Sequence, residues 1–207
     1  MKYRDLCGLK VSEVSLGTVA LGMDYAGQKK VKNPEKIIEA AVDVGINLFD
    51  TAPSYGSEYL LSNVDAIIAT KVKSPNTLKN STKILKSIDI VQWHNPTIGE
   101  LRKSLMLEYM KSLKDYIPIV GASVYTKREA LIAIKTFDMI QVPYNLNNRE
   151  IEEIFPIAKK NGVSVLVRSV FARGELTSLD ALKFALKADI SSALIGARTV
   201  EDVRSAT

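Results

Sequence analysis

Residues 49–56 read FDTAPSYG, and at this point a short apolar run, 46–49, gives way to polar and turn-forming residues. Buried strands of a parallel barrel end in this way, because their carboxyl ends present polar side chains at one rim. We therefore expect Asp50 at the end of a strand and Tyr55 in the loop after it, with Pro53 shaping that loop. The alternative is a turn in which Asp50 only caps backbone groups and Tyr55 is a surface aromatic.

Two later apolar runs also end in side chains that carry acid–base chemistry. The run 66–70 is followed at once by Lys71, and the run 88–92 is followed by Trp93 and then His94, the only histidine of the chain. If these runs are strands of one parallel barrel, their last residues lie at the same rim as the acid and the tyrosine. The coincidence of four such strand ends favours a catalytic site over four unrelated structural residues.

Strand and helix patterns alternate along the whole chain, and turn residues separate them. After a hairpin over 2–14, eight strands are expected at 14–18, 46–50, 66–70, 88–92, 117–122, 137–142, 163–167 and 192–195. The helices between and after them are expected at 34–44, 57–63, 75–86, 101–113, 126–135, 151–160, 179–186 and from 199 onward. The second of these has room for only about two turns.

This alternation predicts a parallel (β/α)8 TIM barrel with an N-terminal β-hairpin and with shortened helices and loops. Residues 1–207 are expected to form a single domain, because no linker-like segment interrupts the pattern. An open, doubly wound sheet that binds a dinucleotide would carry a G-x-G-x-x-G turn after an early strand, and the sequence has none.

The composition is that of an ordinary globular protein, with 46% hydrophobic and 25% charged residues. No apolar run approaches the roughly 20 residues of a membrane span, and the first residues lack the hydrophobic region of a signal peptide, so we expect a cytoplasmic protein without membrane contact. The single cysteine, Cys7, excludes a disulfide within the chain and a thiolate metal cluster, and no metal is expected. The net charge of +5 is spread without a basic block, which argues against nucleic-acid binding.

The motifs D-x-x-x-Y, T-K and W-H-N-P, in this order, resemble those of the aldo-keto reductase family. The resemblance implies a catalytic tetrad of Asp50, Tyr55, Lys71 and His94 on a (β/α)8 barrel. It implies an NADPH-dependent oxidoreductase that reduces small aldehydes or ketones by hydride transfer. In that chemistry Tyr55 is the general acid, Lys71 favours its phenolate, Asp50 holds the ammonium, and His94 orients the carbonyl.

Three further segments, 144–152, 165–176 and 194–203, resemble the face on which that family binds its cofactor. The resemblance places the nicotinamide carboxamide on Ser123 and Gln141 and the adenosine 2′-phosphate on Arg198. The full cofactor-binding set that it implies is Ser123, Gln141, Arg168, Ser169, Gly174, Gly196 and Arg198. One position departs from the family, because Val124 stands where an asparagine usually bonds the carboxamide. An asparagine there would either restore a missing donor or bury an unpartnered amide.

Two other functions are consistent with the same residues. The first is a non-catalytic protein that binds NADP(H) as a sensor or interaction module on the same barrel, since a fold does not fix a function. The second is a lyase that uses Lys71 as a Schiff-base nucleophile. The second leaves unexplained Arg198 and the loop from Ser169 to Gly174, which the resemblance assigns to the pyrophosphate.

Overall fold

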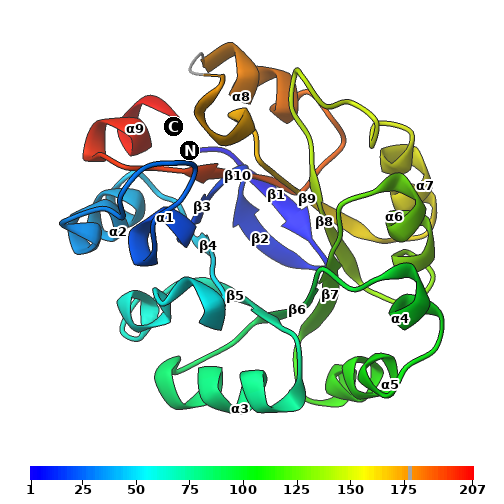
Figure 1. Cartoon of the computed structure of the whole chain (residues 1–207). Helices are drawn as coiled ribbons and strands as arrows, with labels where there is room; N and C mark the ends of the chain where they lie inside the picture. The colour runs from blue at the N-terminus through cyan, green and yellow to red at the C-terminus, as the bar shows by residue number, and fades with distance from the viewer. Residues whose placement is uncertain (177–178) are drawn as a thin grey trace.

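The computed structural model describes residues 1–176 and 179–207. Eight parallel strands close into a barrel in the order β10-β3-β4-β5-β6-β7-β8-β9, as Figure 1 shows. The strands are β3 (Val14–Gly17), β4 (Leu48–Asp50), β5 (Ile67–Val72), β6 (Ile90–His94), β7 (Ile119–Ser123), β8 (Met139–Pro143), β9 (Ser164–Arg168) and β10 (Ser192–Gly196). The predicted fold class is confirmed, and the neighbouring strands follow one another in sequence as a (β/α)8 barrel requires.

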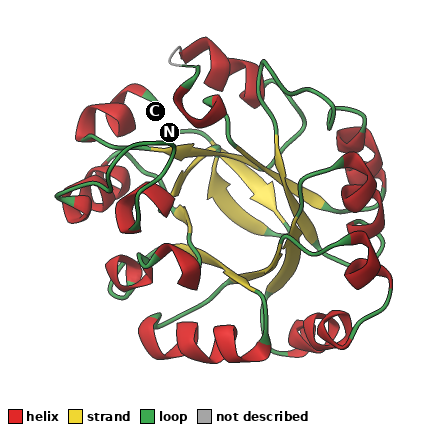
Figure 2. Cartoon of the chain, viewed as in Figure 1, coloured by secondary structure: helices red, strands yellow, loops and turns green. Residues whose placement is uncertain are grey.

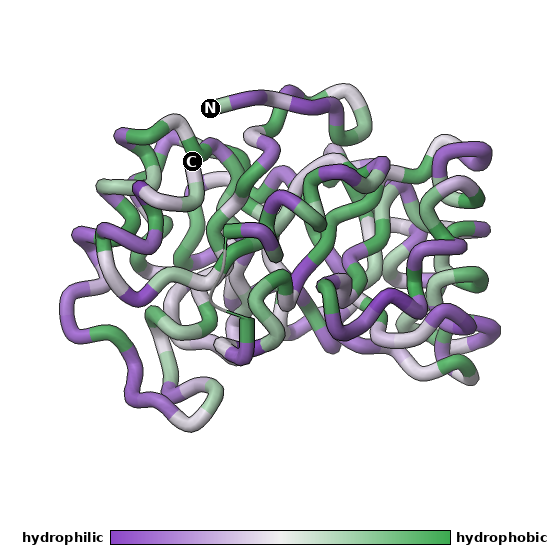
Figure 3. The backbone as a smooth tube through the Cα atoms, turned by 90° about the horizontal axis from the view of Figure 1, so that it is seen from above, coloured by the Kyte–Doolittle hydropathy of each residue, from purple (hydrophilic) through white to green (hydrophobic). Residues whose placement is uncertain are grey.

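The hairpin of β1 (Tyr3–Leu6) and β2 (Leu9–Ser12) closes one end of the barrel, as predicted. Figure 3 shows this N-terminal segment lying across that end. Leu6 and Val11 are fully buried and pack with inward-facing residues of the barrel strands, among them Leu48 and Ile90. The hairpin thus seals the barrel interior at the amino ends of the strands, and the carboxyl ends remain free for polar residues.

Helices form a ring outside the strands, as Figure 2 shows. They are α1 (Val19–Gly22), α2 (Pro34–Asp43), α3 (Pro75–Ile84), α4 (Ile98–Arg102), α5 (Leu105–Ser112), α6 (Lys127–Ala133), α7 (Ile154–Lys160), α8 (Leu179–Leu186) and α9 (Val200–Ser205). Their apolar faces pack on the outward-facing strand residues in one large hydrophobic cluster. Within the described ranges, no helix has the length and apolar character to cross a membrane.

The prediction of one helix over 101–113 is wrong, because α4 and α5 are separate helices. Ser104 has an extended backbone, with φ −164°, and its hydroxyl accepts a hydrogen bond from the Leu107 N–H at the start of α5. A serine that can cap a helix competes with helix continuation, which a hydrophobic spacing does not reveal. Leu105, the first residue of α5, is 92% exposed, although the hydrophobic spacing places it on the same helical face as Leu101.

Two predicted helix positions need smaller corrections. The helix over 151–160 begins only at Ile154, because residues 150–153 form turns. The segment 57–63 contains a single 3-10 turn, η2 (Glu58–Leu61), which follows a shorter one, η1 (Pro53–Tyr55). The second helix of the barrel is therefore even shorter than predicted, and the chain after β4 stays close to the rim.

Helix α1 packs directly against this rim segment, and only glycine fits at the contact. A Cβ atom on Gly22 would lie 2.1 Å from the carbonyl oxygen of Tyr55 and 2.8 Å from the Ser57 nitrogen. Both are backbone atoms, which cannot rotate away as a side chain does. Gly22 therefore fixes how closely α1 approaches the loop that carries Tyr55.

We predict that Gly22→Ala lowers the free energy of unfolding by about 1–3 kcal/mol, the usual cost of overpacking. The matched control is Gly99→Ala in α4, where the nearest atom to the new Cβ is 4.0 Å away. That control should be neutral or slightly stabilising, because alanine favours helix by up to about 1 kcal/mol. Denaturant unfolding of both variants measures the difference, and equal stabilities would show that α1 does not press on the loop.

Candidate active site

The rim at the carboxyl ends of the strands is built around a buried ion pair. Asp50 is the last residue of β4, and Lys71 lies near the end of the neighbouring strand β5. The Lys71 ammonium donates to Asp50 Oδ2 and also to the Thr51 carbonyl oxygen at 3.3 Å. The Lys71 and Asp50 side chains are only 1% and 6% exposed, so the pair lies below the surface of the rim. Lys71 is therefore not an exposed lysine at a strand end.

Two glutamine amides complete the environment of Asp50. Gln92 Nε2 in β6 and Gln141 Nε2 in β8 donate to Asp50 Oδ1 at 3.0 Å and 2.8 Å. Oδ1 is thereby satisfied by two neutral donors, while Oδ2 faces the ammonium. Side chains from β5, β6 and β8 therefore all donate hydrogen bonds to the Asp50 carboxylate inside the barrel.

Sequence reasoning missed Gln92, although a signal was present. Gln92 and His94 lie two positions apart on one strand, so their side chains point to the same face. Gln92 also pairs in register with Lys71, which places it inside the barrel. A glutamine in an otherwise apolar strand at this position indicates a polar role. Its Oε1 is the one buried side-chain oxygen or nitrogen without a hydrogen-bond partner among the described residues.

Tyr55 and His94 lie above the ion pair and close to each other. Their ring centroids are 6.0 Å apart in an edge-to-face arrangement, and the Lys71 ammonium is 5.2 Å from the centre of the Tyr55 ring. Buried hydroxyls support this loop from below: Ser57 Oγ donates to Thr18 Oγ1 at 2.9 Å, and Thr18 in turn donates to the Asp50 carbonyl. The structure thus brings together all four residues of the predicted tetrad.

The pKa of Tyr55 differs from the sequence prediction. Lys71 was expected to favour the phenolate, but burial raises the pKa of Tyr55 well above its usual value, and the negative charge of Asp50 raises it further. The cation that acts in the opposite direction is Arg168. The physical reason is that desolvation disfavours the charged phenolate more strongly than the nearby cations favour it. Tyr55 is therefore a protonated phenol, the form that donates a proton.

Desolvation also shifts the pKa values of His94 and Lys71. Burial lowers the pKa of His94 to about 4, with Lys71 as the next contribution, so the imidazole is neutral near pH 7. Burial also lowers the pKa of Lys71, and the Asp50 carboxylate counteracts that by favouring the ammonium. A neutral imidazole carries one N–H donor and one acceptor, and it can donate to a carbonyl oxygen.

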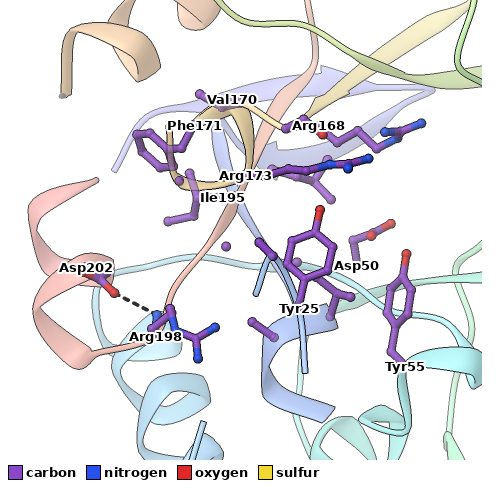
Figure 4. Close-up of a pocket in the computed structure, with 18 of the residues that line it drawn as sticks. Tyr25, Asp50, Tyr55, Arg168, Val170, Phe171, Arg173, Ile195, Arg198 and Asp202 are labelled. Carbon is purple, nitrogen blue, oxygen red and sulfur yellow. Dashed lines mark hydrogen bonds between the residues drawn. The ribbon is translucent and has the colours of Figure 1, made fainter. Parts of the chain in front are cut away.

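A cavity of about 740 Å³ opens above these residues and extends along the rim toward α9. All seven residues predicted to bind a cofactor line it: Ser123, Gln141, Arg168, Ser169, Gly174, Gly196 and Arg198. Ser123 Oγ donates to Gln141 Oε1 at 3.2 Å at the catalytic end. At the other end the Arg198 N–H donates to Asp202, as Figure 4 shows, and its guanidinium donates to the Lys29 carbonyl oxygen.

Val124 does not line this cavity, although its neighbour Ser123 does. Its side chain is fully buried in the hydrophobic cluster beneath the helices, and its carbonyl oxygen accepts a hydrogen bond from Arg168 at 3.2 Å. An asparagine in this position would place an amide among apolar side chains. Of the two outcomes considered from the sequence, the structure favours the buried, unpartnered amide.

Several lining residues carried no signal of function in the sequence. Tyr25 lies in the segment between α1 and α2, and Tyr125 stacks under the Arg168 guanidinium, which is 4.3 Å from the centre of its ring. Arg173 follows β9 and also lines the cavity. Figure 4 shows Tyr25 and Arg173 pointing into the cavity from different loops. Loop residues of this kind are placed by tertiary structure, and no spacing rule identifies them.

The chain resembles known proteins over nearly its whole length. Residues 13–189 match the model of the family described as "Aldo/keto reductase family". Aldo-keto reductase YhdN of Bacillus subtilis is 30% identical over 91% of this chain, and L-galactose dehydrogenase of Arabidopsis thaliana is 28% identical over 82%. The chain spans 68% and 65% of the lengths of these two relatives, about two thirds. The holo form of an aldo-keto reductase from Bacillus halodurans superposes with a TM-score of 0.83 at 26% identity, covering 100% of this chain and 89% of the other.

We predict that the His94 imidazole titrates with a pKa of about 4, because burial and Lys71 disfavour its charged form. Since the chain has one histidine, the ring resonances report this pKa by NMR without assignment. Below pH 6.5 the unfolded chain binds a proton that the folded chain does not, so the free energy of unfolding falls as the pH drops from 6.5 to about 4. In the His94→Gln variant this part of the pH dependence of the unfolding free energy should be absent. A titration at the ordinary value of 6.5 would contradict the assignment.

Proposed function

This chain belongs to the aldo/keto reductase family, and from that membership we propose that it reduces aldehydes or ketones to alcohols with NADPH. The family consists of NAD(P)H-dependent oxidoreductases. The observation that carries the proposal is the meeting of Tyr55 and His94 above the buried pair of Asp50 and Lys71 in one cavity. A non-catalytic protein would leave that arrangement without a role. The lyase alternative is disfavoured because the Lys71 ammonium is buried against Asp50 and does not line the cavity.

The residues of the cavity fit a nicotinamide dinucleotide. Its volume lies within the roughly 300–1,000 Å³ typical of cofactor sites. A hydroxyl and an amide, Ser123 and Gln141, face the catalytic end, where a carboxamide needs both a donor and an acceptor. The guanidinium of Arg198 lies at the far end, where a phosphate ester can accept two parallel N–H bonds. The catalytic end therefore carries neutral polar groups that suit the carboxamide, and the far end carries a cation that suits a phosphate.

When bound, NADPH would supply a hydride to the carbonyl carbon, and the residues of the chain would have to stabilise the negative charge that grows on the carbonyl oxygen. We assign proton donation to the Tyr55 hydroxyl, because its raised pKa keeps it protonated until a stronger base forms beside it. Neutral His94 donates its N–H to the same oxygen and orients the carbonyl. Lys71 stabilises the phenolate that remains after the transfer, and Asp50 keeps the ammonium in place.

Our first test of this mechanism is Tyr55→Phe, which removes one hydroxyl and keeps the ring. Carbonyl reduction should fall by at least about 10²-fold, the usual scale of general acid catalysis. NADPH binding, measured by fluorescence titration, should remain within about twofold. Tyr59→Phe is the matched control, because Tyr59 is 56% exposed and lies outside the cavity. If Tyr55→Phe keeps its turnover, Tyr55 is not the acid.

Arg198→Ala tests the position of the adenosine phosphate. The variant should weaken NADPH at least about tenfold and leave NADH nearly unchanged, because only NADPH carries a 2′-phosphate for the guanidinium. Titration of each cofactor into the wild type and the variant gives the four dissociation constants. Arg204→Ala is the control, since Arg204 is an exposed arginine on α9 that does not line the cavity. Equal losses for both cofactors would reject the assignment.

A further inference from the structure

The Arg168 side chain crosses the rim beside the two residues proposed for the carboxamide. Ser123 ends β7, Gln141 lies in β8 and Arg168 ends β9, and these three strands are neighbours in the barrel. From β9 the guanidinium reaches the carbonyl oxygen of Val124, directly after β7, and donates to it at 3.2 Å. The side chain therefore spans the carboxyl end of β8 and lies next to Ser123 and Gln141.

The same guanidinium lies within electrostatic reach of the tetrad. Burial is the largest influence on the pKa values of Tyr55 and His94, and Arg168 is among the charges that act on both. In Figure 4 the Tyr55 hydroxyl points toward the side of the cavity on which Arg168 lies. Arg168 therefore borders the space between the tetrad and the pair of Ser123 and Gln141.

The charge of Arg168 has no carboxylate partner. Among the described residues it forms no ion pair, and the nearby charge of Asp50 is already compensated by Lys71. Two neutral groups hold the guanidinium, the Val124 carbonyl and the ring of Tyr125. Burial lowers the pKa of Arg168, as expected for a charge removed from water, but a guanidinium remains protonated near pH 7. This end of the cavity therefore carries a fixed positive charge.

Building on the proposed function, which places the nicotinamide ring between the tetrad and the carboxamide residues, we infer that Arg168 makes the site prefer NADPH to NADP⁺. The two forms differ by one hydride, and its loss converts a neutral ring into a ring with one positive charge. Like charges repel strongly in a partly closed site, so the guanidinium disfavours the oxidised ring. Both forms carry the same phosphates, so cations that meet the phosphates do not distinguish them.

This preference acts on the exchange of the cofactor. Reduction of a carbonyl leaves NADP⁺ in the site, and repulsion by Arg168 speeds its release and makes it a weak competitor of NADPH. The same repulsion opposes the positive charge that grows on the ring during hydride loss. Arg168 therefore determines which redox form the site binds, and it does not promote the transfer itself.

The experiment compares the dissociation constants of NADPH and NADP⁺, measured by calorimetry for the wild type and three variants. Arg168→Gln removes the charge and keeps a polar side chain, whereas Arg168→Lys keeps the charge. Arg198→Ala is the matched control, because it removes one positive charge from the far end of the same cavity.

We expect the wild type to bind NADPH at least about tenfold more tightly than NADP⁺. Arg168→Gln should lower this ratio at least about fivefold, mainly through tighter binding of NADP⁺, and Arg168→Lys should keep most of it. Arg198→Ala should weaken both forms by the same factor and leave the ratio unchanged. Equal affinities in the wild type, an unchanged ratio in Arg168→Gln, or an equal loss of the ratio in Arg168→Lys would overturn the inference and leave the reductase proposal standing.

Because the ratio is a binding measurement, it separates this inference from the proposed activity. A preference for NADPH that depends on the charge of Arg168, in a protein that reduces no aldehyde, would support the inference and favour the non-catalytic alternative. Absence of binding of both forms to the wild type would overturn the inference together with the proposed function.

Discussion

The buried ion pair of Asp50 and Lys71 is the interaction on which the rest of the site depends. Removing two charges from water costs several kcal/mol for each ion, and their attraction repays this only when the remaining lone pairs and protons are also satisfied. Gln92 and Gln141 satisfy Asp50 Oδ1, and the Thr51 carbonyl accepts from the ammonium. The closed barrel supplies these groups from separate strands, which an isolated hairpin or helix pair cannot do.

The pair also sets the electrostatics above it. Burial dominates at Tyr55, and the negative charge of Asp50 adds to it, so the hydroxyl stays protonated. The same burial keeps His94 neutral. Both groups are therefore proton or hydrogen-bond donors toward the cavity at neutral pH, which suits a reaction in which negative charge develops on an oxygen.

The barrel and the tetrad of Asp50, Tyr55, Lys71 and His94 could be predicted from the sequence, because the ends of buried strands are easy to recognise there. An apolar run that stops at Asp50, Lys71 or His94 already fixes the rim at which each side chain emerges. Helix boundaries were less well predicted, because Ser104 divides a continuous hydrophobic pattern by capping a new helix. The contacts of Gln92 and of lining residues such as Tyr25 and Tyr125 depend on neighbours from distant strands and on the conformation of loops. Their positions follow from tertiary structure and could not be derived from spacing.

Asp50 and Lys71 form one buried unit, and a double-mutant cycle of unfolding free energies tests this most directly. Asp50→Asn, Lys71→Met and the double variant are unfolded in denaturant beside the wild type. Each single change leaves one buried charge uncompensated and should cost about 3–5 kcal/mol. The double change should cost clearly less than the sum of the two, because no charge remains unpaired. Losses that simply add would contradict the account, since they would mean that the two residues stabilise the protein independently.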